Sequence, residues 1–485
     1  MRSRTLARRQ TSSCGRVSRR AGAARPPRLC VCGPRTQPCS TRPPKPCSRP
    51  VGPSPSARAC ASCAWKCAAD RSRRCWRPIN SRPWDSRVNC AARSIAGPPP
   101  VSGGASSPRN RARIRTLMTT RERIVVVMPS WVGDVVMATP ALRLLRDRRP
   151  GAHITALLRP GLVELLEGST LVDAMETGDA RGVFGPLAAG RQIRRGRFHA
   201  ALLLTNSFST ALATWLGMVP RRVGFDRDGR GLLLTDALRA PHDRQGWQVV
   251  PAVRYYMHAA LAMLGGARAL EYLPPTSLTH APLGAAEGTR LELSLSPVQA
   301  SRARAVLERG GVAPDKPYAL LNPGGNNPAK RWPIERFARL ADHLAASHGL
   351  QVLLNGSPGE RDVVDAIAGA CRSTPVRLTE LGMTLGALKG VVRGARMMVT
   401  NDTGPRHIAG AFGVPLVSLF GPTDPRWTTI PVASLPDGSS SEAILIANTG
   451  LPLERLSNDD PEGSRIDRIG LDAVAGACDR LLEVR

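Results

Sequence analysis

The fold is decided by residues 398–425, MVTNDTGPRHIAGAFGVPLVSLFGPTDP. A mostly apolar run at 395–399 stops at the polar sequence 400–404, TNDTG. A helix-like segment with Pro in its first turn then extends to Phe412, and 414–420 is typical of a second buried strand. The stretch therefore predicts a strand, a tight turn, a helix and a strand in immediate succession, the unit of an α/β fold.

The start of this helix is predicted to bind phosphate. Polar residues followed by Pro are typical of a helix N-terminus, where unpaired N–H groups and a partial positive charge attract anions. Gly404 would let a ligand approach the backbone, and His407 lies one turn on, on the same face as Thr403. We therefore interpret 398–425 as the floor of a phosphate or nucleotide site.

Basic residues are concentrated in the first quarter of the chain. Residues 1–117 hold 26 of the 68 Lys and Arg residues but 2 of the 37 acidic residues, a net charge of +24. Residues 118–485 hold the other 42 basic and 35 acidic residues, a net charge of +7. Ten of the twelve Cys also precede Met118, and the few that follow suit a reducing cytoplasm.

Residues 1–117 are predicted to be disordered, because they are rich in Arg, Pro and Cys and show no apolar periodicity. A basic tail for nucleic acid or membrane and a transit-like leader are two interpretations. We favour a third, a translation start placed too early, with the natural start near Met118. Cys60, Cys63 and Cys67 are not accompanied by the further ligands that would complete a zinc site, so no metal site is expected there.

Two series of alternating strands and helices follow Met118. The first begins with the strand-like run RIVVVM at 123–128, and the second with a helix-like segment at 296–309. We predict an α/β protein of two doubly wound domains, 118–290 and 291–485, facing a cleft lined by the carboxyl ends of the strands. The sequence contains no run of 18 apolar residues, so no membrane-spanning helix is expected.

Strand-end loops of the second domain carry the candidate donor site. Lys330 is a point charge suited to a diphosphate, and Glu360 could accept hydrogen bonds from ribose hydroxyls. Each residue alone fits an ordinary turn or helix cap, but their occurrence at three successive strand ends favours a ligand site. The predicted set is Gly324, Lys330, Glu360, Asp402, Thr403, Gly404 and His407.

The first domain carries the candidate base and acceptor residues. Asp134 follows the first strand, where it either complements the helix dipole or acts as a general base facing the cleft. Asn206 and Ser207 stand at an equivalent strand end and could bind a hydroxylated acceptor, together with Ser130 and Gly133.

Three other motifs are interpreted as structural. Asp226 and Asp228 form a D-x-D, a metal motif in some sugar transferases, but here it is more typical of a turn. The sequence 229–231, GRG, lacks the third glycine of a dinucleotide fingerprint. Tyr255 and Tyr256 stand on a predicted helix and are expected in the core.

Five motifs in order resemble the heptosyltransferases of glycosyltransferase family 9. They are PSWVGD (129–134), TNSF (205–208), NPGG…AKRWP (322–333), NDTGPRHIA (401–409) and FGPTDP (420–425). The resemblance implies a GT-B fold of two Rossmann-like domains, with the acceptor in the first and the ADP-sugar in the second. It implies that Asp134 is the base and that Lys330, Asp402, Thr403, Gly404 and His407 contact the donor. Trp131-Val132 favours type II of the family.

The implied reaction is an inverting transfer of heptose from ADP-L-glycero-D-manno-heptose to a heptosyl-Kdo-lipid A acceptor. Asp134 would take the hydroxyl proton while Lys330 and the helix near Gly404 stabilise the leaving ADP, so no metal or other cofactor is expected. We expect a monomer at the cytoplasmic face of the inner membrane that binds no nucleic acid.

Three alternatives stay open. A related GT-B enzyme could use another nucleotide sugar, because sequence does not report sugar stereochemistry. A Rossmann-type oxidoreductase is disfavoured by the missing G-x-G-x-x-G fingerprint. Nucleic-acid binding, suggested by the net charge of +31, is disfavoured because most of that charge precedes Met118.

Overall fold

The structure, a computed structural model, describes residues 121–239, 242–243, 246–247, 249–265, 289–447 and 465–484. The predicted extension 1–117 and its Cys motif lie outside these residues, as does 266–288, just before the predicted domain boundary.

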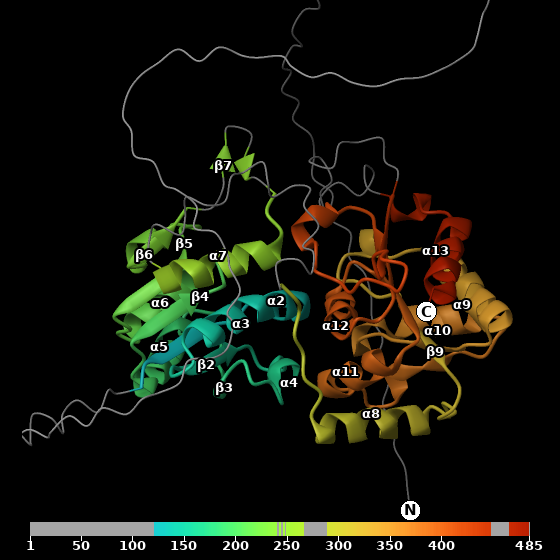
Figure 1. Cartoon of the computed structure of the whole chain (residues 1–485), viewed down its shortest axis with the longest axis horizontal. Helices are drawn as coiled ribbons and strands as arrows, with labels where there is room; N and C mark the ends of the chain where they lie inside the picture. The colour runs from blue at the N-terminus through green and yellow to red at the C-terminus, as the bar shows by residue number, and fades with distance from the viewer. Residues whose placement is uncertain are drawn as a thin grey trace, which may run out of the picture. The chain divides into compact units, whose positions relative to one another are not determined.

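The first domain is built on a six-stranded parallel sheet with the strand order β3-β2-β1-β4-β5-β6 (Figure 1). Its strands are β1 (Arg123–Val127), β2 (His153–Leu158), β3 (Ala174–Thr177), β4 (Ala200–Leu203), β5 (Arg221–Phe225) and β6 (Asp236–Leu238). Its helices are α2 (Val132–Met137), α3 (Thr139–Arg148), α4 (Val163–Leu166), α5 (Gly185–Gly196), α6 (Phe208–Leu216) and α7 (Ala252–Gly265). A short hairpin, β7 (His242–Asp243) and β8 (Gly246–Trp247), lies apart from the sheet.

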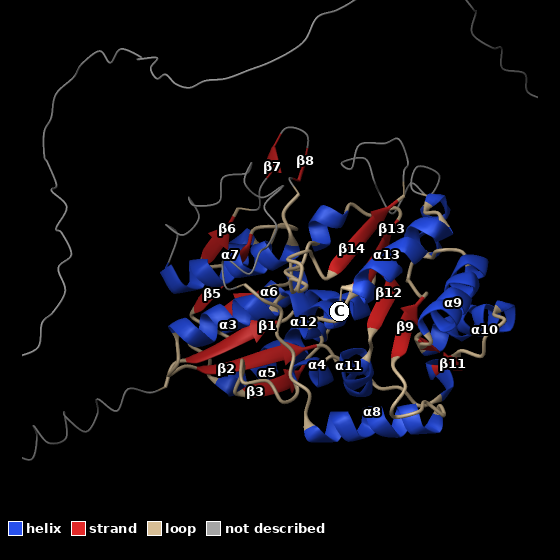
Figure 2. Cartoon of the chain, turned by 45° about the vertical axis from the view of Figure 1, so that its right-hand side comes forward, coloured by secondary structure: helices blue, strands red, loops and turns tan. Residues whose placement is uncertain are grey.

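The second domain repeats this topology with the order β11-β10-β9-β12-β13-β14 (Figure 2). Its strands are β9 (Tyr318–Asn322), β10 (Gln351–Leu354), β11 (Val376–Arg377), β12 (Met397–Asn401), β13 (Leu416–Phe420) and β14 (Glu442–Ile446). Its longer helices are α8 (Pro297–Arg309), α9 (Ile334–His348), α10 (Arg361–Ala370), α11 (Leu385–Gly394), α12 (Gly404–Phe412) and α13 (Leu471–Glu483). Each sheet has the strand order of a Rossmann fold, so the predicted architecture is confirmed.

The apolar β1 run is explained by helices on both faces of its sheet. Ile124 and Val126 pack into one core with α2, α3 and α7, whereas Val125 and Val127 pack into another with α5 and α6. A strand buried on both faces has no polar face, and its sequence is therefore continuously apolar.

The helix after β1 differs from the predicted one. The sequence predicts one helix over 135–148, but α2 begins at Val132 and gives way to α3 at Ala138, which is the C-cap of one and the N-cap of the other. Pro140 in the first turn of α3 lacks an N–H group, which breaks the hydrogen-bond ladder between the two helices. Asp134 therefore lies inside the first turn of α2.

Three edge strands were not predicted. β6 and β11 have three and two residues, too few for a periodic signal, and β14 follows a run rich in Ser, Asp and Gly that is typical of a loop. All three are at a sheet edge, where pairing with one neighbour decides the structure.

The domains contact each other through buried and partly buried polar groups. Lys389 on α11 is fully buried, and its Nζ donates to the carbonyl oxygens of Glu164 and Leu165 at 2.9 and 3.1 Å. Arg143 on α3 pairs with Glu292 at 2.6 Å. None of the helices within the described ranges is long and apolar enough to cross a membrane.

Candidate functional site

A central cavity of about 860 Å³ lies between the two domains, at the carboxyl ends of β1, β9, β10 and β12. The first domain contributes residues of α2, including Asp134, and the turn residue Trp131. The second contributes the strand-end loops that contain Lys330, Glu360 and Asp402. Its volume is that of a pocket for a ligand of drug or nucleotide size.

Asp134 enters the cavity from the first turn of α2 and is held there by a tyrosine. The hydroxyl of Tyr256, on α7, donates to Asp134 Oδ1 at 2.9 Å. Burial raises the pKa of the Asp134 carboxyl above its ordinary 3.8, the Tyr256 hydrogen bond opposes that rise, and the negative charge of Asp402 adds to it. A half-buried carboxylate with a raised pKa is a suitable general base.

Glycines allow α2 and α12 to pack closely against each other at the wall of the cavity. A Cβ on Gly133 would lie 2.4 Å from His407 Cδ2, and one on Gly404 would lie 2.8 Å from Val132 Cβ. Both glycines line the cavity, but the structure also gives each a packing role that the sequence did not suggest.

Gly133→Ala is expected to destabilise the protein by roughly 1–3 kcal/mol, because the buried His407 ring cannot move aside without strain. Thermal unfolding measures the effect. Gly369→Ala on α10, where nothing lies within 4 Å of the new Cβ, is the helical control and should leave Tm equal or slightly higher. Equal stability of Gly133→Ala and the parent, or failure of His407→Ala to restore it, would contradict this packing.

His407 is neutral in this environment. Burial, and to a smaller extent the charge of Arg406, lower its pKa to about 3 against the opposing charge of Asp402. Its Nδ1 accepts or donates no hydrogen bond to any other described residue. His407 therefore packs against Gly133 and lines the cavity, without supplying a positive charge.

Lys330 supplies a cation at the cavity wall. Its Nζ lies 3.1 Å from Asp402 Oδ2, and Thr423 donates to the same oxygen at 3.0 Å. Burial alone would raise the pKa of Asp402, but the charges of Lys330 and Arg406 outweigh it and hold that pKa below 3.8. Asp402 is thus an ionised carboxylate that orients Lys330.

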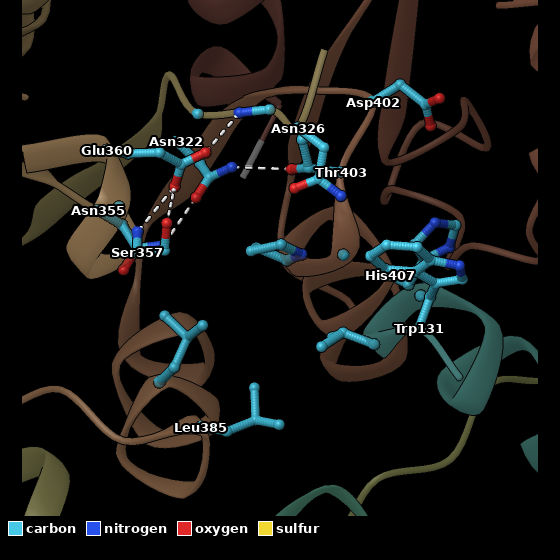
Figure 3. Close-up of a pocket in the computed structure, with 18 of the residues that line it drawn as sticks. Trp131, Asn322, Asn326, Asn355, Ser357, Glu360, Leu385, Asp402, Thr403 and His407 are labelled. Carbon is cyan, nitrogen blue, oxygen red and sulfur yellow. Dashed lines mark hydrogen bonds between the residues drawn. The ribbon is translucent and has the colours of Figure 1, made fainter. Parts of the chain in front are cut away.

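Thr403 is the N-cap residue of α12, yet its side chain does not cap the helix. Its hydroxyl instead accepts from Asn322 Nδ2 at 2.8 Å, and Asn322 accepts from Asn355 Nδ2 at 2.6 Å (Figure 3). These hydrogen bonds tie together the ends of β9, β10 and the start of α12. The N-terminus of α12 consequently faces the cavity without a side-chain cap, as an anion site requires.

Glu360 holds the glycine-rich loop after β9. Its Oε1 accepts from the N–H of Gly325 at 2.6 Å, and its Oε2 accepts from Ser357 N and Oγ at 2.7 and 2.8 Å (Figure 3). A Cβ on Gly324 would lie 2.2 Å from Glu360 Oε1, which explains the glycine there. Glu360 lines the cavity, but its carboxylate already has a structural role.

Arg406 anchors the floor of the site. Its guanidinium is fully buried and pairs with Glu442 on β14 at 2.7 Å, while it also donates to Ser418 and to the carbonyl oxygen of Thr428. The sequence motif 401–409 contains this arginine, but its partner lies in β14, an edge strand that the sequence did not predict. The ion pair fixes α12 against the sheet edge.

The predicted acceptor residues are divided among three places, of which the central cavity holds Gly133. Ser130 and Ser207 line a separate side cavity of about 200 Å³, which also contains Arg159 and Thr210. Ser130 adjoins Trp131 of the central cavity, so the two cavities are neighbours along this turn.

Asn206 lies in a hydrogen-bonded cluster instead. Its Oδ1 accepts from Tyr255 at 2.9 Å and from Arg230 at 3.3 Å. Burial lowers the pKa of Arg230 to about 10, which still leaves the side chain charged at neutral pH. Its Nη1 makes no hydrogen bond to another described residue, but the side chain is fully buried, and neither Asn206 nor Arg230 lines either cavity.

Among the described residues, the group of three side chains placed closely enough to share a metal ion lies away from the central cavity. His343, His348 and Asp479, on α9 and α13, have ligand atoms within 4.8 Å of one another, and both imidazoles hydrogen-bond to Asp479 Oδ1. Asp226 and Asp228 lie in a turn in which Asp228 has a φ of +56°, consistent with the structural interpretation of that motif.

Comparisons with known proteins agree with this geometry. The family model of glycosyltransferase family 9 (heptosyltransferase) matches residues 187–445. The chain is 31% identical over 326 residues to lipopolysaccharide heptosyltransferase 2 of Salmonella typhimurium, covering 63% of this chain and 84% of that protein.

Two solved structures have the same fold. The E. coli ADP-heptose LPS heptosyltransferase II matches with a TM-score of 0.58 and 25% identity, covering 74% of this chain and 98% of that one. A family 9 glycosyltransferase from Veillonella parvula matches with a TM-score of 0.59 and 22% identity, covering 75% and 97%.

Proposed function

From the membership of this chain in glycosyltransferase family 9, we propose that it transfers heptose from ADP-L-glycero-D-manno-heptose to a heptosyl-Kdo-lipid A acceptor of the lipopolysaccharide inner core. The family membership confirms the predicted resemblance and makes the protein a glycosyltransferase. It removes the oxidoreductase alternative. The similarity to proteins named heptosyltransferase 2 or II supports the assignment to type II of the family.

One observation carries the proposal: a candidate base and a candidate phosphate-binding cation line one cavity from opposite domains. Asp134 belongs to the first domain, Lys330 to the second, and the two carboxylates Asp134 and Asp402 are near enough to interact electrostatically. An inverting transfer needs a base on the acceptor side of the anomeric carbon and positive charge on the leaving-group side.

The proposed step is a single displacement. The acceptor hydroxyl oxygen attacks the anomeric carbon of the heptose while the bond from that carbon to the diphosphate oxygen breaks. Asp134 takes the hydroxyl proton, and ADP leaves with the bonding electron pair. Lys330 and the uncapped N-terminus of α12 stabilise the negative charge that builds up on the diphosphate. The proposed step therefore needs no metal ion to compensate that charge.

Nucleotide binding tests the donor class. We expect ADP-heptose and ADP to raise Tm, whereas UDP and NAD give much smaller shifts at equal concentration. Transfer should persist after dialysis against a chelator of divalent cations. A larger shift with UDP or NAD than with ADP, or loss of transfer that added Mg²⁺ restores, would contradict the proposal.

The pH dependence of transfer tests the role of Asp134. As a base it must be ionised, so kcat/KM should fall as the pH drops through its raised pKa. Tyr256→Phe removes the hydrogen bond that lowers this pKa, and the acid limb should therefore move to higher pH. Tyr255→Phe is the control on the same helix: it removes a hydrogen bond to Asn206 and none to Asp134, so its acid limb should stay in place. An unmoved acid limb in Tyr256→Phe would separate Tyr256 from the base.

The acceptor is proposed to bind along the first domain. Ser130, Gly133 and Ser207, which line the two cavities, and Asn206, the neighbour of Ser207 in the chain, are proposed to hold it there. The protein is proposed to act as a monomer at the cytoplasmic face of the inner membrane, without binding nucleic acid.

A further inference from the structure

We infer that the exposed start of α5 docks onto an anionic lipid surface, an inference that rests on the proposed use of a lipid-linked acceptor. Two large apolar side chains stand there in water. Val183 and Phe184 are 89% and 78% exposed, and Leu187 in the first turn of the helix is also exposed. Phe208, at the start of the neighbouring helix α6, is 48% exposed.

These apolar side chains contribute little to the core of the domain. The side of α5 that packs on the sheet is formed by Ala189 and Ile193, which are buried with residues of β1 and β4. Val183 and Phe184 precede that packed face and project beyond it. A cluster of exposed apolar residues that the fold does not need is typical of an interaction site.

The charge next to this cluster identifies the occupant. Residues 180–199 contain five Arg and no Asp or Glu. Arg191, Arg194, Arg195 and Arg197 are exposed along α5 and just after it. Asp179, just before this range, pairs with Arg181, but the four arginines from 191 to 197 leave the helix basic. Apolar side chains at one end of a helix and a basic surface along it are the features of a segment that lies in an anionic membrane interface.

The position of α5 fits a lipid-linked substrate. Helices α5 and α6 pack side by side, and both begin at the carboxyl edge of the first sheet (Figure 1). The side cavity, lined by Ser130 and Ser207, also includes Arg181 beside the cluster. An acceptor held there could keep its lipid in the bilayer while its sugar reaches toward Asp134 through the adjoining central cavity.

Vesicle binding by the full chain tests this surface. We expect co-sedimentation with vesicles of phosphatidylglycerol and phosphatidylethanolamine, and much less with vesicles of phosphatidylcholine alone. The double variant Val183→Ser/Phe184→Ser should lose at least ten-fold in vesicle partitioning, as should Arg194→Glu/Arg195→Glu. Val298→Ser, an exposed apolar residue on α8, is the matched control and should bind like the parent.

Two acceptors distinguish failure of docking from failure of the proposed function. With the acceptor in vesicles, the Val183→Ser/Phe184→Ser protein should lose most of its transfer rate. With a deacylated, water-soluble acceptor it should equal the parent. If the parent transfers heptose but the variant binds vesicles equally well, docking is overturned. A dimer of the parent that this variant dissociates, without a change in vesicle binding, would assign the cluster to a second copy of the chain.

Discussion

Asp134→Asn is expected to reduce transfer by about 10²- to 10⁴-fold, while ADP-heptose binding changes little. Asparagine has the same shape as aspartate, and its oxygen can still accept the hydrogen bond from Tyr256. It cannot take the proton of the acceptor hydroxyl. Steady-state transfer rates and calorimetric titration with ADP-heptose measure the two effects separately.

The control for this substitution is Asp147→Asn, which removes an exposed carboxylate of the same domain. It should retain the rate of the parent. Turnover near that of the parent in Asp134→Asn would remove Asp134 from the base role, and an equal loss of donor binding would make it a donor residue instead.

Lys330→Ala is expected to lower kcat/KM for ADP-heptose by about 10²- to 10³-fold, as the loss of one preorganised charge-stabilising group does. Two physical changes act together. The diphosphate loses a cation, and the Asp402 carboxylate, whose side chain is 8% exposed, loses its ion-pair partner and faces the donor as a bare negative charge. Kinetics with varied ADP-heptose concentration measure the loss.

A double variant separates the two changes. Adding Asp402→Asn to Lys330→Ala removes the unpaired negative charge, so donor affinity should recover in part while the rate of the chemical step stays low. Lys316→Ala, an exposed lysine before β9, is the control and should have no effect. Unchanged donor affinity and rate in Lys330→Ala would refute the assignment of Lys330 to the diphosphate.

The fold could be predicted because each signal is local. β1 and β9 are short apolar runs, and the start of α12 carries polar residues, glycine and proline next to one another. Such patterns depend on neighbours in the chain, and the repeated alternation of strands and helices then leaves few topologies open. The motifs shared with the family are also local, and they indicate which residues at these strand ends belong to the candidate site.

Contacts between distant residues could not be predicted. Tyr256 is 122 residues from Asp134, and α7 reads as a core helix because its sequence is largely apolar. The need for glycine at 133 depends on His407 in the other domain. In the same way the buried Arg406 of α12 pairs with Glu442 of β14, a residue 36 positions later in the chain. Each depends on a partner that only the folded chain brings close.

Glu360 shows a limit of another kind. The sequence correctly places it at the start of a helix that borders the cavity, but its carboxylate holds the N–H groups of Gly325 and Ser357. The positions of candidate residues at strand ends follow from topology. Whether one of these side chains is free to bind a ligand depends on the hydrogen bonds that it already makes within the loops.

The most direct test of the proposed reaction is the product formed from ADP-L-glycero-D-manno-heptose and heptosyl-Kdo-lipid A, identified by mass spectrometry and by NMR of the new linkage. We predict one added heptose, one ADP released for each transfer, and an anomeric configuration opposite to that of the donor. Retention of the donor configuration, or transfer from another nucleotide sugar with none from ADP-heptose, would contradict the inverting displacement by Asp134 and Lys330.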